Sequence, residues 1–359
     1  MGALAPPVAA VRAAVRRALR AARPVPPATS PPLVLVACSG GADSLALAAA
    51  TGFVAPRSGW RAGLLTVDHQ LQPRSGAQAR AVAGWAGAAG LDPVEVRSVA
   101  VPPGGAGGPE AAARTARYRA LAVAAGRLGA TAVLLGHTRD DQAETVLLAL
   151  ARGAGPHGLA GMPARRDRDG VAWLRPLLGI SRAQTEAACR ALQLTPWQDP
   201  HNQDPAYARV RVRQVALPAL VAALGDRVVD NLARTAAQLA ADTAALDGLA
   251  AAALATARTG AGGLAVAALQ ELPDAIRSRV LHGWARELGA AGSALSHRHV
   301  AALDALVTGW HGQGAAYLPG GIQVARRGGT LQVTAGPAAR PGAGGPDPGE
   351  HEVRGAQTT

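Results

Sequence analysis

Short apolar runs alternate with longer amphipathic stretches over the first part of the chain. The run Leu33–Ala37 is continuous and apolar, which predicts a buried parallel strand, and a helix is expected at residues 45–50. This alternation of strands with helices indicates an α/β fold with a parallel sheet, whose ligands bind beyond the carboxyl ends of the strands. The further strands are expected at residues 62–67, 94–99 and 132–135, and the further helices at residues 77–89, 110–128 and 141–151.

The pattern changes at about residue 227, where helices rich in alanine and leucine begin. They are expected at residues 228–249 and 275–288, and a hairpin follows because apolar positions flank the sequence Arg326-Arg327-Gly328-Gly329. A Gly/Pro-rich ending with few large apolar groups predicts a disordered tail. Four segments result: a basic helix and proline-rich linker (1–32), a parallel-sheet domain (33–225), a smaller, mainly helical domain (226–335), and the tail (336–359).

The N-terminal segment predicts an amphipathic basic helix. Such a helix can dock on the main domain, contact RNA or simply present a solvated arginine face, and the sequence leaves these readings open. The apolar positions at helical spacing are Val8, Val11, Val15 and Leu19, and the arginines of another face are Arg12, Arg16, Arg20 and Arg23.

Composition excludes several classes of enzyme. The 359 residues exceed one typical domain, so two domains are expected. All 36 basic residues are arginine, which excludes a Walker A loop and Schiff-base catalysis, since both need a lysine. The net charge of +12 indicates a polyanionic partner, although a merely basic surface would also explain it.

Cysteine content and hydropathy bear on the compartment. Cys38 and Cys189 are too few for a disulfide scaffold, a four-cysteine zinc site or an all-cysteine iron–sulfur cluster, so a reducing cytoplasm fits best. No apolar run is expected to reach the roughly 20 residues of a membrane span. The N-terminus also lacks a compact apolar region followed by a cleavage site, which argues against a signal peptide.

The segment Ser39-Gly40-Gly41-Ala42-Asp43-Ser44 lies between the first strand and the first helix. Its glycines let backbone N–H groups approach an anion, and the helix N-terminus adds to this phosphate cradle. A carboxylate beside phosphates is repulsive unless a cation such as Mg²⁺ lies between them. An ordinary turn in which Asp43 caps the helix is the alternative.

This hexapeptide resembles the SGGxDS loop of the PP-loop ATP pyrophosphatases. The resemblance implies that ATP is split to AMP and pyrophosphate while a substrate oxygen is adenylated. It also implies that ATP contacts Ser39, Gly40, Gly41, Ala42, Asp43 and Ser44.

A second motif opens the helix after the fourth strand and reads GHTRDDQAET from Gly136 to Thr145. The helix dipole accounts for one acidic residue in a first turn, but Asp140, Asp141 and Glu144 exceed that need. The stretch is similar to the GHxxDDQAET signature of the tRNA(Ile)-lysidine synthases.

Three further segments extend this resemblance, which covers residues 33 to about 220. The family usually has asparagine where this chain has Val210, so no role is given to that amide. The segments are VDHQL at residues 67–71, the ExxARxxRY pattern at residues 110–118, and RPLL at residues 175–178 with the later residues Asp199, Asn202, Arg209 and Arg213.

The resemblance implies an ATP-dependent ligase that joins free L-lysine to the first anticodon cytidine of a tRNA(Ile) with a CAU anticodon, through an adenylated base. Mg²⁺ is the implied metal, and a homodimer is compatible with the sequence. Another RNA-modifying or amide-forming PP-loop ligase is the alternative, and a non-catalytic RNA-binding module would explain the charge but not the motifs. The implied residues are Asp43, Asp141 and His137 for catalysis; Asp43 and Asp141 for the metal; Asp68 and His69 for ATP, beside the loop; Asp140, Glu144 and Arg114 for lysine or substrate; and Arg175, Arg209, Arg211 and Arg213 for tRNA.

Overall fold

A computed structural model describes residues 4–23, 30–68, 70, 75–100, 108–168, 170–198, 203–292 and 294–335, with the backbone alone at residues 108–111. Contacts divide the chain into two compact units, Met1–Thr243 and Ala244–Thr359. His69, Asp199, Asn202 and the expected tail lie outside the described residues.

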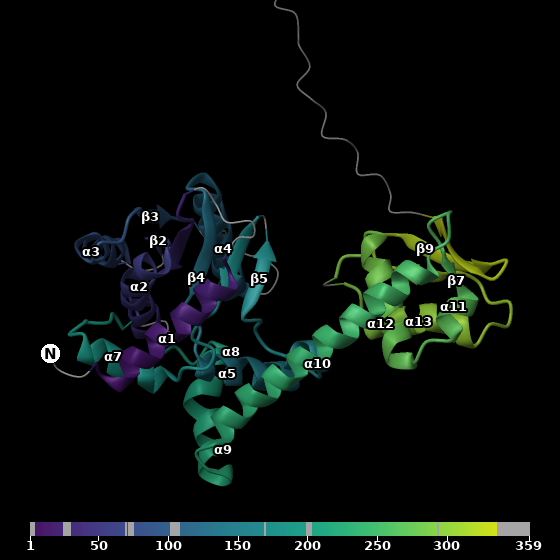
Figure 1. Ribbon diagram of the computed structural model, residues 1–359. Coiled ribbons are helices and arrows are strands. Elements are labelled where there is room, and N and C mark those ends of the chain that lie inside the picture. The colour runs from purple at the N-terminus through teal and green to yellow at the C-terminus, as the bar shows by residue number, and fades with distance from the viewer. Residues whose placement is uncertain are drawn as a thin grey trace, which may run out of the picture. The chain divides into compact units, whose positions relative to one another are not determined.

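The first unit contains a six-stranded sheet with the order β3-β2-β1-β4-β6-β5. Figure 1 labels four of its strands, β2, β3, β4 and β5. All neighbours pair in parallel except β5, which runs antiparallel to β6 at the edge. The α/β fold and the four expected strands are confirmed, whereas the last two were not predicted. The strands are β1 (Leu33–Ala37), β2 (Arg61–Asp68), β3 (Val94–Ser98), β4 (Ala130–Leu135), β5 (Arg165–Arg168) and β6 (Val171–Leu174).

Successive strand residues face the two sides of the sheet, and each side has its own core. Val34 and Val36 belong to one buried cluster, while Leu33 and Leu35 belong to another. The first cluster includes residues of α1 (Pro6–Ala21), α2 (Ala42–Val54), α3 (Ser75–Ala88) and α7 (Arg182–Ala191), and the second those of α4 (Gly108–Arg127). The N-terminal helix therefore docks on the sheet domain through its apolar face.

The strand order creates a switch point between β1 and β4. The chain leaves β1 toward β2 on one side and returns at β4 on the other, so the loops after these two strands diverge. Ligands of open α/β sheets bind in the crevice at such a point. Both sequence motifs lie there. The remaining helices of this unit are α5 (Arg139–Leu150), α6 (Pro156–Leu159), α8 (Ala208–Arg211), a π-helical segment (Val212–Ala216) and α9 (Leu217–Leu224).

The second unit combines helices with a small antiparallel sheet of order β7-β10-β9-β8. The expected hairpin is confirmed: Arg327 pairs with Thr330 across Gly328 and Gly329, whose positive φ angles of 53° and 73° suit a tight two-residue turn. The other two strands were not predicted. The elements are β7 (Leu264–Ala265), α11 (Val266–Gln270), α12 (Asp274–Glu287), α13 (His297–Thr308), β8 (Ala316–Leu318), β9 (Ile322–Arg327) and β10 (Thr330–Ala335).

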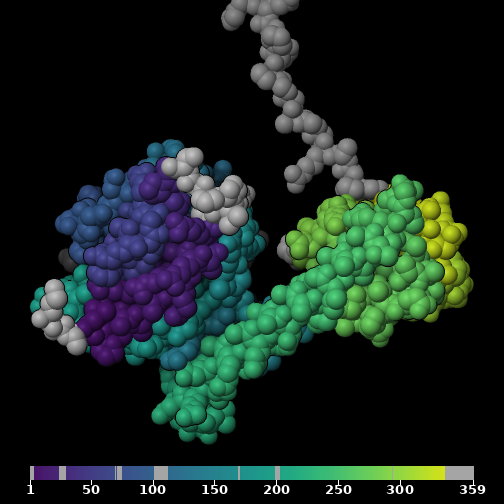
Figure 2. All heavy atoms as spheres, viewed as in Figure 1, coloured from purple at the N-terminus to yellow at the C-terminus, as the bar shows by residue number. Residues whose placement is uncertain are grey.

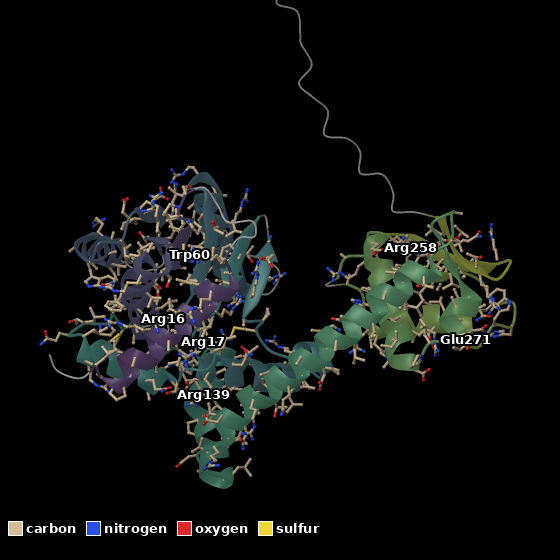
Figure 3. The ribbon with its side chains drawn as sticks, viewed as in Figure 1. Arg16, Arg17, Trp60, Arg139, Arg258 and Glu271 are labelled. Carbon is tan, nitrogen blue, oxygen red and sulfur yellow. The ribbon has the colours of Figure 1, made fainter. Side chains whose placement is uncertain are left out.

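Helix α10 (Val228–Ala257) corrects the expectation that no apolar segment reaches membrane length. Among the described residues, it alone is long and apolar enough to cross a membrane by length and composition. Alanine supplies much of its apolar character, and it carries charged side chains such as Asp230, which pairs with Arg139 at 2.8 Å. Arg139 is labelled in Figure 3. Length and composition alone do not distinguish a membrane span from a long helix of a globular protein.

Candidate active site

A cavity of about 840 Å³ lies at the carboxyl ends of β1, β2 and β4. Its volume falls within the range of small-molecule sites, roughly 300–1,000 Å³. The predicted residues that line it are Ser39, Gly41, Ala42, Asp43, Ser44, His137, Asp141 and Arg213. Other lining residues include Gln78, Arg117, Tyr118, Arg182, Glu186, Arg190 and Trp197.

The loop after β1 is held by its own side chains. Ser39 N donates to Ser44 Oγ at 3.2 Å, and Ser44 Oγ donates to the carbonyl of Gly41 at 3.0 Å. Gly40 has a φ of +87°, and a Cβ there would lie 2.7 Å from Gln78 Nε2. Glycine is therefore required at Gly40 by both backbone conformation and space.

A second glycine brings the two motifs together. A Cβ on Gly136 would lie 3.0 Å from both the backbone nitrogen and the Cα of Ser44. Because few real Cβ atoms approach backbone so closely, glycine at this position lets the end of β4 lie against the start of α2 without a shift of either.

Arg182, at the start of α7, connects three carboxylates of these motifs. Its Nη2 lies 3.1 Å from Asp141 Oδ1 and 3.3 Å from Glu144 Oε1, and its Nε lies 3.8 Å from Asp43 Oδ2. Its backbone N–H also donates to Asp140 Oδ2 at 2.8 Å. An arginine from a separate helix therefore offsets part of the negative charge of this acidic cluster.

Glu144 is completely buried, and arginines surround its carboxylate. Arg213 Nε donates to Oε1 at 2.7 Å, Arg213 Nη2 donates to Oε2 at 3.1 Å, and Arg209 Nε lies 3.4 Å from Oε2. With Arg182, three guanidinium groups face this one carboxylate. This arrangement suits a buried charge that holds arginines in place, rather than one that waits for a cationic substrate.

Neighbouring carboxylates have pKa values that move in opposite directions. Burial raises the pKa of Asp43 from 3.8 to about 6, although Thr185 donates a hydrogen bond to it. Burial acts in the same direction on Asp141, but Arg182 and the N–H of Thr138 outweigh it and hold its pKa below the usual value. Thr138 N and Oγ1 donate to Asp141 Oδ2 at 2.8 and 2.9 Å. Such a separation is typical of active sites.

His137 is held as a neutral imidazole. Burial lowers its pKa to about 3, and nearby arginines act in the same direction although Asp141 opposes them. Within the part of the chain that the structure describes, its buried Nδ1 has no hydrogen-bond partner. A neutral imidazole beside the phosphate loop can exchange hydrogen bonds with a bound substrate.

Asp68 and Arg114 are among the predicted residues that do not line the cavity. Asp68 is buried, and its Oδ1 accepts from Gln70 N at 2.9 Å. The Arg114 guanidinium lies 5.2 Å from the centre of the Tyr118 ring, and Tyr118 itself lines the cavity. Neither side chain therefore lines the space that a ligand would fill.

The four arginines predicted for tRNA have different surroundings. Arg175 is 7% exposed and donates to the carbonyl of Pro163 at 2.8 Å, which argues against a tRNA contact. Arg209 and Arg213 face Glu144, as their i, i+4 spacing allows. Arg211 is exposed and bonds the carbonyls of the preceding turn.

Sequence reasoning missed Arg182 and Thr185. A signal was present: Ser181 and Gln184 form a capping box, with Ser181 N donating to Gln184 Oε1 at 2.9 Å. This pattern marks a helix start and would have placed Arg182 in its first turn. The later Trp197, whose backbone N–H donates to the carbonyl of Gly40 at 2.9 Å, belongs to the segment around Asp199 that carries the resemblance, but it was given no role.

The donor set bears on the predicted magnesium. Among the described residues, no group of three or more His, Cys, Asp or Glu side chains could hold a metal ion. Magnesium in nucleotide sites is commonly bound by one or two carboxylates together with substrate phosphates, and it does not need a closed set of protein ligands. The pair Asp43 and Asp141 fits that requirement.

Comparisons with known proteins agree with both motifs. A PP-loop domain family matches residues 13–220, and the TilS substrate binding domain matches residues 264–332. The chain is 67% identical over 331 residues to the tRNA(Ile)-lysidine synthase of Salinispora tropica, covering 92% of this chain and 97% of that protein. It is 51% identical over 351 residues to the enzyme of the same name from Streptomyces coelicolor, covering 92% and 99%.

A solved structure supports the fold alone. The U34-tRNA thiolase NcsA from Methanococcus maripaludis aligns with a TM-score of 0.51 at 16% identity, covering 65% of this chain and 80% of that chain.

Proposed function

The chain belongs to the tRNA(Ile)-lysidine synthase family of ATP-dependent ligases, and we propose that it joins free lysine to the first anticodon cytidine of a tRNA(Ile) with a CAU anticodon. The observation that carries this proposal is that residues of the Ser39–Ser44 loop and Asp141 of α5 line the same cavity. The cytosine carbonyl oxygen attacks the α-phosphate of ATP, pyrophosphate leaves, and the lysine amine then displaces AMP.

The loop between β1 and α2 binds the phosphates in this proposal. Its N–H groups and the N-terminus of α2 stabilise negative charge that develops as the α-phosphate is attacked. Asp43 and Asp141 would hold Mg²⁺, which supplies charge neutralisation on the phosphates. The neutral His137 would orient a substrate polar group by a hydrogen bond.

Lysine must come from solution, because the chain contains no lysine of its own. We assign its cationic group to Asp140, which remains partly exposed at the start of α5. Glu144 was predicted for the same role, but its three arginine partners support a positioning role instead. Arg114 would act indirectly, by holding Tyr118 at the cavity wall.

The tRNA would contact both units. The match of residues 264–332 to a substrate binding domain supports a tRNA-binding role for the region from 226 to 335, and Arg211 is an exposed candidate contact in the first unit. Cys38 and Cys189 are free, which fits the reducing cytoplasm in which we place the enzyme. The homodimer remains a prediction.

Mass spectrometry of nucleosides tests this proposal. The enzyme is incubated with ATP, lysine and either tRNA(Ile) or a methionine tRNA, which shares the CAU anticodon. We expect one cytidine of tRNA(Ile) to gain the mass of lysine less one water, and no gain on the methionine tRNA. Incorporation of ammonia or sulfur instead would favour another PP-loop ligase.

A further inference from the structure

The outward face of α1 carries arginines and no acidic side chain. Arg16, Arg17, Arg20 and Arg23 are all exposed. Figure 2 shows α1 as a purple band along one face of the first unit, and Figure 3 labels Arg16 and Arg17 on it. Arg16 and Arg20 are separated by one helical turn, or about 6 Å along the axis. The result is a stripe of positive charge.

The edge strand β5 continues this positive surface. Arg165 Nη1 donates to the carbonyl of Ala21 at the end of α1, at 3.3 Å. All four residues of β5 are exposed, and its one acid, Asp167, is bonded by Arg165. We name this region the α1–β5 surface, defined by Arg16, Arg17, Arg20, Arg23, Arg165 and Arg166.

The α1–β5 surface is held firmly on the domain. The apolar face of α1 is buried in the core beside α2 and α7, with Val15 and Leu19 fully covered. At the edge of that face, the Arg12 guanidinium lies 3.4 Å from the centre of the Phe53 ring. An amphipathic helix that binds a lipid surface needs its apolar face free, so the buried face of α1 argues against a membrane.

None of the residues of the α1–β5 surface lines the active-site cavity. Its arginines other than Arg165, which bonds Asp167 and Ala21, are therefore available for a polyanion while the cavity holds ATP and the reacting base. Guanidinium groups bind phosphate by paired hydrogen bonds and are the common side chains for backbone contacts to nucleic acids.

We propose that the α1–β5 surface binds the sugar–phosphate backbone of the tRNA substrate, away from the anticodon base that reacts. This inference rests on the proposed function, since it takes tRNA as the polyanion. It assigns a role to the N-terminal helix, which none of the chemical motifs includes. The contact contributes affinity and leaves the chemistry of the bound complex unchanged.

The test uses the full chain with R16Q, R17Q and R20Q combined. We expect KM for tRNA to rise at least tenfold and kcat to stay within about twofold. The slope of log affinity against log salt, measured without lysine, should flatten by up to about 2.7, at ~0.9 for each phosphate contact. The combination R97Q, R119Q and R127Q is the matched control, because it removes the same charge from β3 and α4; it should keep the wild-type KM.

Two further variants sharpen the result. R16K, R17K and R20K together keep the charge and should restore most of the affinity, and R166Q alone should flatten the slope by about 0.9. Equal KM and equal slope in the glutamine variant and its control would overturn the proposal. The proposal would also be overturned if the glutamine variant lost binding to anionic phosphatidylglycerol vesicles while its affinity for tRNA stayed intact. Absence of lysidine with the wild-type enzyme would contradict the proposed function, whereas the salt slope tests the surface separately.

Discussion

Arg182 Nη2 donates to Asp141 Oδ1 at 3.1 Å, although 41 positions separate these residues in the chain. The same guanidinium faces Asp43 and Glu144, so it ties the first turn of α7 to both sequence motifs. Several carboxylates around one site repel each other and resist ionisation. A central arginine lets them remain charged and fixes their spacing.

Replacing Arg182 with glutamine should therefore impair catalysis more than folding. We expect kcat/KM for ATP to fall on the order of 100-fold, because the carboxylates would lose their alignment with the loop. Arg182→Lys keeps the charge but not the planar fork and should recover only part of the loss. Pyrophosphate release measures the effect, with Ala183→Gln at the next, exposed position of the same helix as control. Wild-type rates in Arg182→Gln would contradict this role.

Glu144→Gln should mainly lower stability. The substitution leaves three guanidinium groups around a neutral amide in a buried site, and breaking such a pair typically costs about 3–5 kcal/mol. Denaturant unfolding measures it. Glu186→Gln, at an exposed position of α7, should change stability by less than about 0.5 kcal/mol. Equal stability of the two variants would show that the arginines do not depend on Glu144.

Asp43→Asn should raise the free energy of unfolding at pH 8 although it abolishes activity. The pKa of Asp43 is raised from 3.8 to about 6, so the folded state binds this proton more tightly than the unfolded chain. Stability therefore falls as pH rises from about 4 to 6, and the loss is complete above that window. The asparagine variant, without this ionisation, should be more stable than wild type at pH 8, by on the order of 1 kcal/mol, and equal to it below pH 4.

The same variant should release no pyrophosphate at any pH, while tRNA affinity changes by less than about threefold. Wild-type kcat/KM for ATP, which reports the free enzyme, should decline as the pH falls through about 6, where Asp43 becomes protonated. Thermal unfolding at several pH values and pyrophosphate release check both parts. A stability difference independent of pH would contradict the assignment.

Gly136→Ala should weaken ATP binding. Its Cβ would meet the backbone of Ser44 at 3.0 Å, so either the loop or the end of β4 must shift. We expect ATP affinity to fall about tenfold or more. Gly84→Ala is the matched control, because nothing lies within 4 Å of that Cβ position and the residue is exposed on α3; it should gain up to about 1 kcal/mol of stability. Equal ATP affinity in the two variants would contradict the close-approach argument.

The sequence predicted the elements whose signal is local. The apolar run of β1 and the Gly-Gly turn after Arg327 each specify their structure within a few residues. By contrast, β5 reads Arg-Arg-Asp-Arg and has no apolar pattern, because both its side chains and its outer edge face solvent. Its strand conformation depends on pairing with β6.

Residue partners across the chain were harder to predict than the motifs. Asp141 was identified from its motif, but its contact with Arg182 exists only because the start of α5 lies against the start of α7. Likewise, the charge of Glu144 suggested a cationic ligand, whereas the fold supplies three arginines from two other segments. Long-range pairing of this kind is a property of the tertiary structure.

We propose that one cavity first adenylates a tRNA base and then joins free lysine to that base with release of AMP. The most direct measurement incubates the enzyme with tRNA(Ile), ATP and Mg²⁺, first without lysine and then with it, and follows pyrophosphate, AMP and the mass of the tRNA. We expect pyrophosphate release and an adenylated tRNA in the first stage, followed by AMP release and a lysine mass gain on one cytidine in the second. AMP release that is indifferent to lysine would contradict the account.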